Sequence, residues 1–340
     1  EAVHVGVDVH KASYSVALFS DGRGLITTWV QPARPEVLLE RLRPLREGIA
    51  QVVSEAGPTG FDLARRLRAE GFKAVVIAPS KLLAPVGPEA KSDRLDCRRL
   101  AQLSAKGLLH PVRVPTEQEE ADRQVLRLRE QLVRRTRSVQ AQIKSFLLQH
   151  AIAEPAGLGH WSKASVAVLR GLALLPELRF CLDLLLDELA HAQEQVQRVT
   201  VRLKGLAEAD RHRKATAAMC SVPGVGVITA ASFRLELPEP ERFDHDGQVA
   251  RMAGLAPQVR QSGETRREGG LLKSGNARLR TVLVEAAWRW VAYDETAARR
   301  YRQLVANTGS SKKAVVAMAR RLGVLLWRLS VHGEPYRAVA

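Results

Sequence analysis

The chain has 340 residues, of which 52 are Lys or Arg and 36 are Asp or Glu, so its net charge is +16. This length predicts two or three domains, each with its own core. The basic surplus favours a polyanionic partner, and nucleic acid is the first candidate, although charge alone also fits a merely basic protein. No run of about 18 apolar residues is present, so we expect no membrane-spanning segment.

The three cysteines, Cys97, Cys181 and Cys220, show neither the spacing of a zinc site nor the pairing pattern of a disulfide framework. We therefore expect a chain that works in the reducing cytoplasm.

The first third of the sequence predicts an α/β domain over residues 1–112. Apolar and β-branched runs at 3–9, 14–20 and 25–30 predict three antiparallel strands, with Asp21-Gly22-Arg23-Gly24 as a hairpin turn. The sequence then predicts a helix at 35–46, a strand at 51–54, a helix at 60–70 that is opened by Pro58, and a strand at 73–78. A connector follows Pro79, and a last helix begins near residue 93.

Four acids lie at the ends of these elements. Asp8 ends the first strand and Glu55 the fourth, while Asp93 and Asp96 are three residues apart and share one helix face. If strands one and four are neighbours, the four carboxylates converge and repel one another unless cations lie between them. Two Mg²⁺ ions would neutralise the cluster and support an in-line phosphoryl transfer.

Two other interpretations of these residues stay open. Asp93 and Asp96 are also acceptable as helix-opening aspartates, with Ser92 as the cap. An Asp at the end of a first strand, with Gly6 and Lys11 nearby, also occurs in the phosphate site of sugar kinases and actin-like ATPases. The sequence shows no second phosphate loop to support that class.

Residues 113–212 predict a helical arm. A basic amphipathic helix runs from about 116 to 150, and Glu154-Pro155 ends it. Apolar residues from Leu178 to Leu206 then follow a four-three alternation typical of a coiled coil. The pattern fits equally a hairpin that packs on the basic helix and a homodimer arm.

Residues 213–340 predict a mostly helical domain that contains two glycine-rich features. Ser221-Val-Pro-Gly-Val-Gly226 lies between two helical segments and resembles a helix-hairpin-helix, in which Gly224 and Gly226 let backbone N–H groups hold a phosphate. An ordinary corner between two helices would look similar.

The second feature is a loop or hairpin over residues 254–276, rich in Gly and Arg. Ser262 and Ser274 are its candidate nucleophiles, although most serines in such turns are structural. The candidate partners for phosphate oxygens are Arg260, Arg266, Arg267, Lys273 and Arg278. Helices are expected at 277–292, 295–305 and 312–328.

Five motifs in sequence order resemble the DEDD transposases of the insertion sequence 110 family. They are Val-Gly-Val-Asp8, Ser-Glu55-Ala-Gly-Pro-Thr-Gly, Lys-Ser-Asp93-Arg-Leu-Asp96, Val-Pro-Gly-Val-Gly226 and Gly-Leu-Ala-Pro-Gln-Val-Arg-Gln-Ser262-Gly. The resemblance implies a RuvC-like domain of the ribonuclease H fold with Asp8, Glu55, Asp93 and Asp96 as its acids. It also implies a coiled-coil linker and a transposase domain whose catalytic serine matches Ser262, which we prefer to Ser274.

The resemblance further implies a bacterial, nucleoid-associated recombinase that excises its element as a circle and inserts it into target DNA. A non-coding bridge RNA is expected to pair with donor and target DNA and to supply the sequence choice. A dimer or tetramer is implied, with the acids of one subunit completing a site with the serine of another. Ser262 is expected to form a 5′-phosphoserine link, supported by Mg²⁺.

Three competing functions remain. A site-specific DNA invertase would share all five motifs. A RuvC-type junction nuclease would use water as its nucleophile and leave Ser262 structural, and a non-catalytic RNA-binding scaffold would have no use for the four acids.

Overall fold

The structure, a computed structural model, describes residues 1–79, 93–262, 265–272 and 274–338, with the backbone alone for 93–95, 259–262 and 265–268. Its contacts divide the chain into two compact units, Glu1–Thr116 and Glu117–Ala340. The N-terminal unit is mixed α/β, and the C-terminal unit is mostly helical, as expected. The further boundary near residue 212 stays a prediction.

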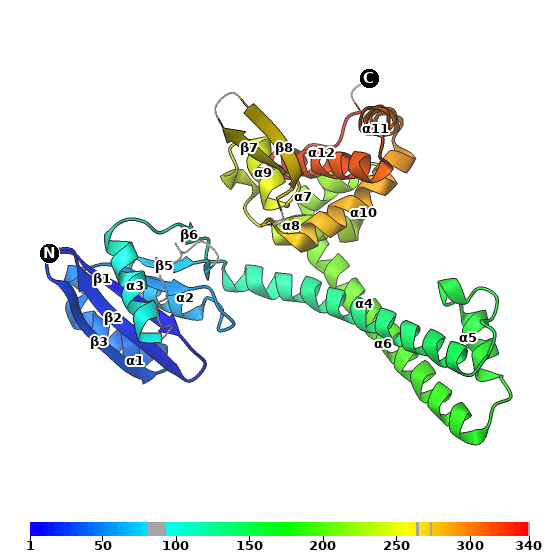
Figure 1. The fold of residues 1–340 in the computed structure, drawn as a ribbon, viewed down its shortest axis with the longest axis horizontal. Helices are drawn as coiled ribbons and strands as arrows, with labels where there is room; N and C mark the ends of the chain where they lie inside the picture. The colour runs from blue at the N-terminus through cyan, green and yellow to red at the C-terminus, as the bar shows by residue number, and fades with distance from the viewer. Residues whose placement is uncertain (80–92, 263–264, 273, 339–340) are drawn as a thin grey trace. The chain divides into compact units, whose positions relative to one another are not determined.

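The N-terminal unit contains one six-stranded sheet in the order β3-β2-β1-β4-β5-β6 (Figure 1). β1 pairs antiparallel with β2 and parallel with β4, and β5 continues the parallel part. The prediction that strands one and four are neighbours is therefore confirmed. The elements are β1 (Val3–Val9), β2 (Ser13–Ser20), β3 (Gly24–Pro32), α1 (Pro35–Leu42), η1 (Arg43–Gly48), β4 (Ile49–Glu55), α2 (Asp62–Ala69), β5 (Ala74–Ile77), α3 (Asp93–Ala105) and β6 (Pro111–Val112).

Three details differ from the expectation. The first helix is shorter, because its last residues continue as the 3₁₀ turn η1. α2 begins at Asp62, so Pro58 lies in the preceding turn rather than at the helix start. The two-residue strand β6 was not expected, and the connector after Pro79, with Ser92, lies outside the described residues.

The two faces of the sheet are covered by different helices. Valines that alternate along β1 and β4, such as Val5, Val7 and Val52, are buried together with leucines of α1 and α2. On the opposite face α3 packs on β1 and β2 through Cys97 and Ala101. Because successive side chains of a strand point to opposite faces of the sheet, one face packs in the main core and the other face packs against α3.

The C-terminal unit begins with two helices of 33 residues that lie side by side (Figure 1). Their interface buries Val139, Ile143 and Leu147 of α4 against Leu182, Leu186 and Leu189 of α6. The seam expected for a coiled coil is thus used within the chain. The elements are α4 (Glu117–Gln149), η3 (Leu158–His160), α5 (Lys163–Arg170), α6 (Pro176–Glu208), α7 (Asp210–Cys220), α8 (Val227–Glu236), η4 (Pro240–Arg242), α9 (Asp246–Met252), β7 (Pro257–Ser262), β8 (Thr265–Leu271), α10 (Ala277–Tyr293), α11 (Glu295–Thr308) and α12 (Ser311–His332).

The remaining helices surround a second core, in which Met219, Phe233, Leu283 and Leu322 are almost completely buried. β7 and β8 form a separate two-stranded antiparallel ribbon. No helix in the described part of the chain is long and apolar enough to span a membrane.

Candidate active site

The acids Asp8 and Glu55 lie at the ends of two neighbouring strands. β1 and β4 run parallel, and the last residues that pair between these two strands are Val7 and Ser54. Asp8 directly follows Val7 and Glu55 directly follows Ser54. Both strands therefore present an acid at the same edge of the sheet.

α3 can pack closely on β1 because Gly6 has no side chain. A Cβ on Gly6 would overlap the backbone carbonyl of Cys97 and would lie 2.7 Å from the backbone nitrogen of Ala101. Burial raises the pKa of the Cys97 thiol to about 11, and the negative charge of Asp8 contributes in the same direction. Gly6 therefore packs under a helix, which differs from a role in a phosphate-binding loop.

The two remaining acids belong to the first turns of α3. Asp93 is the first residue of the helix and Asp96 precedes Cys97, so Asp96 is adjacent to the contact with β1. The side chain of Asp93 lies outside the described part. Three of the four predicted acids are thus brought to the region where β1, β4 and α3 meet, and the fourth lies on the same helix.

A cleft of about 310 Å³ opens at this edge on the side of α1 and α2, and its lining includes Glu55, His10 and Lys11 but neither Asp8 nor Asp96. His10 Nε2 lies 3.0 Å from the Asp8 carboxylate. Among the described side chains no three His, Cys, Asp or Glu residues form a metal-binding group. The donors that are present are carboxylate oxygens, the type of ligand that Mg²⁺ prefers, so the acids fit a magnesium site in kind.

Ser262 is the last residue of strand β7 in the second unit. It pairs with Thr265, and Arg260 pairs with Arg267 two positions before. Because residues directly opposite in an antiparallel ribbon share a face and faces alternate along a strand, Ser262, Arg260 and Arg267 fall on one face. Arg266, which pairs with Gln261, falls on the other face.

The ribbon is fixed at its base by two glycines. A Cβ on Gly275 would overlap the backbone nitrogen of Gly254 and would lie 2.5 Å from its Cα. Ser274 is exposed in the turn beside this contact, so the two candidate serines lie at opposite ends of the ribbon. Lys273 lies outside the described residues.

The two glycines of the predicted hairpin have different environments. Gly224 has φ +82°, and a Cβ there would lie 2.7 to 2.8 Å from the backbone of Arg289 and Trp290, so this glycine is required by packing on α10. Gly226 precedes α8, and a Cβ on it would contact nothing within 4 Å. Of the two, only Gly226 has room for a Cβ.

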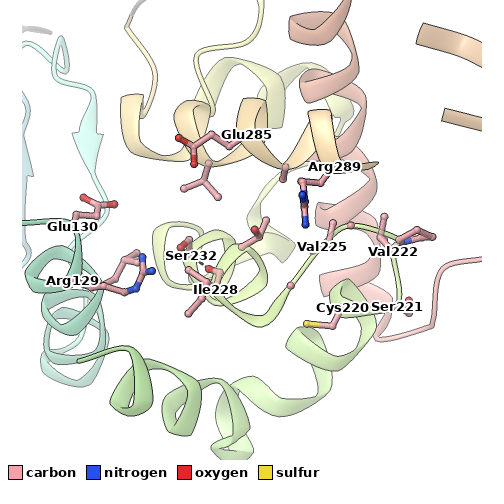
Figure 2. Close-up of a pocket in the computed structure, with 17 residues that line it drawn as sticks. Arg129, Glu130, Cys220, Ser221, Val222, Val225, Ile228, Ser232, Glu285 and Arg289 are labelled. Carbon is pink, nitrogen blue, oxygen red and sulfur yellow. Dashed lines mark hydrogen bonds between the residues drawn. The ribbon is translucent and has the colours of Figure 1, made fainter. Parts of the chain in front are cut away.

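A cavity of about 670 Å³ opens beside this hairpin, and Figure 2 shows the side chains around it. Arg129 and Glu130 of α4 lie on one side, and Glu285 and Arg289 of α10 on another. Arg278, a predicted nucleic-acid ligand, is ion-paired to Glu130 with 2.7 Å between Nε and Oε2.

Sequence reasoning missed a buried polar cluster at the base of the arm. Asp122 of α4 is only 3% exposed and accepts hydrogen bonds from Arg211, His212 and Gln118. Burial alone would raise the pKa of Asp122, but these hydrogen bonds outweigh it and lower the pKa to about 2. The partners are about ninety residues apart in sequence, and no local signal predicts such a pairing.

A second unexpected contact joins the C-terminal segment to the hairpin. The backbone N–H of Tyr336 donates to the Ser221 hydroxyl at 2.6 Å, and its phenol donates to Asp294 at 3.0 Å. Burial, together with the hydrogen bond and the charge of Asp294, raises the pKa of Tyr336 to about 12.

Comparison with known proteins gives matches over both units. Residues 216–302 match the family described as "Transposase IS116/IS110/IS902 family", and residues 5–152 match the IS110-type DEDD family described as "Transposase". The putative transposase y4qE of Sinorhizobium fredii is 31% identical over an alignment that covers 96% of this chain and 88% of that protein.

Two further relatives are named for the elements that they serve. The transposase for insertion sequence element IS1111A of Coxiella burnetii is 23% identical, with 99% of this chain and 92% of the relative covered. The transposase for insertion sequence element IS1328 of Yersinia enterocolitica is 24% identical, with 81% of each chain covered. Since the matches extend over nearly the whole sequence and agree in both units, the chain belongs to the IS110 family of transposases.

Proposed function

We propose that this transposase cuts and rejoins DNA through a covalent link to Ser262, supported by a magnesium site of Asp8, Glu55, Asp93 and Asp96. The observation that carries the proposal is the position of Ser262 at the last paired rung of a two-stranded ribbon, on the same face as two arginines.

The acids supply the second part of the proposal. Asp8 and Glu55 end adjacent parallel strands, and Asp96 lies on the helix that packs over them. A RuvC-like site needs carboxylates at such an edge, and Mg²⁺ would neutralise their charge and coordinate phosphate oxygens when bound. Asp8, Glu55, Asp93 and Asp96 are the residues that would hold it.

The proposed reaction conserves the phosphodiester. The Ser262 hydroxyl attacks phosphorus, a 5′-phosphoserine bond forms, and the strand leaves as a 3′-hydroxyl that takes up the proton lost by the serine. In the second step the 3′-hydroxyl of the exchanged strand attacks the same phosphorus and the serine is released with its proton. Bond energy is retained, so the exchange requires no nucleotide cofactor.

The basic residues are proposed to hold the phosphates during these steps. Arg260 and Arg267 share the ribbon face of Ser262, which supports a role for them at the scissile phosphate. Arg266, Lys273 and Arg278 are proposed to contact the backbone further away, and the hairpin of Gly224 and Gly226 to hold a phosphate through N–H groups.

We further propose that a bridge RNA supplies the sequence choice and that the protein works as a homo-oligomer, either a dimer or a tetramer. The net charge of +16 supports contact with more than one nucleic-acid strand. Guidance by base pairing leaves the protein to bind backbones.

The test is to purify the protein with its co-expressed RNA, add Mg²⁺ and end-labelled donor DNA, and run denaturing gels before and after protease treatment. We expect a protease-sensitive DNA adduct that is absent in Ser262→Ala and Asp93→Ala and retained in the matched control Ser274→Ala. Normal cleavage by Ser262→Ala without an adduct would identify a water-using nuclease and overturn the serine mechanism. Plasmid inversion without excised circles would identify an invertase.

A further inference from the structure

The cavity beside the 221–226 hairpin has three walls that come from distant parts of the sequence. α4, the hairpin with the start of α8, and α10 enclose a volume of about 670 Å³, within the usual range of ligand-binding cavities. Figure 2 shows Arg129 directed toward Ile228 and Ser232, and Arg289 directed from α10 toward the hairpin at Val225. Two guanidinium groups thus reach the same cavity from different walls.

Neither Arg129 nor Arg289 forms an ion pair in the part of the chain that the structure describes. Glu130 contributes an attractive charge to Arg129, but its ion pair is with Arg278. Arg129 is half-buried, and its Nε donates to the Thr200 hydroxyl at 2.9 Å, which fixes the side chain. Arg289 lies over the ring of Tyr293 at 5.2 Å.

Several other arginines of this unit form ion pairs in the described part of the chain. The pairs are Arg135–Glu188, Arg170–Asp187, Arg179–Asp183, Arg211–Asp122, Arg213–Asp210, Arg278–Glu130, Arg302–Glu295 and Arg328–Asp246. The Arg278 pair engages Glu130, the carboxylate next to Arg129, so Glu130 is already occupied. Burial disfavours the charged form of a cation, and it lowers the pKa of Arg129 although the charge of Glu130 acts in the opposite direction.

The backbone on the floor of the cavity favours the same kind of ligand. Gly226 is the N-cap of the ten-residue helix α8, which has no side-chain cap. The first N–H groups of a helix have no carbonyl partner within it and carry the positive end of its dipole. Because a Cβ on Gly226 would contact nothing within 4 Å, this end of the helix is open to a ligand.

We propose that this cavity binds a phosphodiester group of a nucleic-acid backbone between Arg129 and Arg289, with the N–H groups at the start of α8 as further donors. The inference rests on the proposed function, since it takes the ligand to be a nucleic acid on which the transposase acts. It adds Arg129 and Arg289 to the binding residues and separates Gly226, which faces the ligand, from Gly224, which packs on α10. DNA and RNA share the phosphodiester, and the experiment distinguishes them.

Binding is measured by fluorescence anisotropy in full-length protein that carries Ser262→Ala, so that no chemistry is required. The probes are a labelled 30-base-pair DNA duplex and a labelled RNA hairpin, each titrated at several salt concentrations. For Arg129→Gln/Arg289→Gln we expect a roughly tenfold weaker Kd on at least one probe and a salt slope smaller by about one to two. The matched control Arg213→Gln/Arg302→Gln removes the same charge from exposed ion pairs and is expected to bind within about twofold of the parent.

A second variant tests the site without weakening the fold. Gly226 has the extended backbone of an N-cap and open space around it, so Gly226→Asp is expected to leave the melting temperature unchanged or raised. Its carboxylate would occupy the anion position, and binding is expected to weaken about tenfold, clearly more than in the isosteric neutral variant Gly226→Asn. The comparison of Asp with Asn therefore reports on charge in the cavity and not on folding.

The probe that loses affinity identifies the nucleic acid that the cavity holds. Unchanged binding and salt slope of the arginine pair on both probes, or equal binding by Gly226→Asp and Gly226→Asn, would overturn the inference. The serine adduct described above would then stand unaffected. Absence of that adduct, together with weakened binding by the cavity variants, would instead reject the serine mechanism and leave the cavity assignment in place.

Discussion

The two units both use a glycine to bring an element against a helix backbone, but they place their functional residues differently around it. In the N-terminal unit Gly6 lies under α3, and the acids Asp8 and Asp96 lie on the two elements that this contact joins. In the C-terminal unit Gly224 lies against α10, whereas Ser262 is at the end of a ribbon that has its own glycine contact at the base. The geometry of the acids is therefore coupled to the core, and the position of the serine depends on the ribbon alone.

The largest effect is expected where a carboxylate on the rigid frame is removed. Asp8→Asn keeps the shape of the side chain and removes its charge, so cleavage of labelled DNA should fall by about a hundredfold or more, since metal stabilisation of phosphoryl transfer amounts to several kcal/mol. The exposed turn residue Asp21 provides the control Asp21→Asn, which should cleave at the parental rate. Equal activity of the two variants would remove Asp8 from the site.

The two glycine contacts themselves can be broken. Gly6→Ala and Gly224→Ala each place a methyl group against backbone atoms, so each should lower the free energy of unfolding by about 2–3 kcal/mol in urea denaturation. Gly6→Ala should also reduce cleavage in the remaining folded protein, because α3 must move away from β1. The control Gly205→Ala, at an exposed position in the last turn of α6 with free space around it, should stabilise the protein by up to about 1 kcal/mol.

Acid should weaken the C-terminal unit through the base of the arm. The pKa of Asp122 is lowered to about 2, so its stabilising contribution is fully present above pH 4 and is lost as the pH falls toward 2. The shift corresponds to about 2 kcal/mol, which should appear as a loss of stability in that window in urea titrations. Asp122→Asn should remove this pH dependence; a variant that keeps the parental dependence would place its origin elsewhere.

The smallest effect is expected at the C-terminal segment. Tyr336→Phe removes the hydrogen bond to Asp294 and should cost about 1 kcal/mol in the same denaturation assay at neutral pH. Because the pKa of Tyr336 is raised to about 12, its contribution is present below pH 10 and is lost as the pH rises toward 12. The parent and the Phe variant should therefore approach equal stability over that interval, and a constant difference would contradict the assignment.

The positions of Asp8 and Glu55 at the ends of neighbouring strands were predictable because the signal is local. Asp8 and Glu55 directly follow β-branched runs, and a parallel pairing of those strands brings their ends together without further information. The extent of the long helices was also predictable, since α4 and α6 carry an apolar periodicity over many turns. The heptad pattern could not show whether α6 packs on a helix of the same chain or on a second chain, however, because both arrangements have the same sequence requirement.

Contacts between distant residues were not predictable. Asp122 looks like any acid in the first turns of a helix, and nothing near Arg211 or His212 marks them as its partners. Gly224 and Gly226 belong to one motif, but only the structure separates the glycine that packs on α10 from the glycine that has room for a side chain. In the sequence Arg129 is one of many basic residues of a helix. Only the structure shows that it is half-buried and hydrogen-bonded to Thr200.

The paired helices α4 and α6 also set a length scale. Each has 33 residues, so the arm measures roughly 50 Å from base to tip. Its base is fastened by Asp122 and its distal half by a repeating apolar seam, so one heptad could be deleted from each helix while the seam stays in register. Such a deletion would draw the tip back by about 10 Å and leave both cores unchanged. The length of the arm can thus change in steps of one heptad without a change in the residues proposed for catalysis.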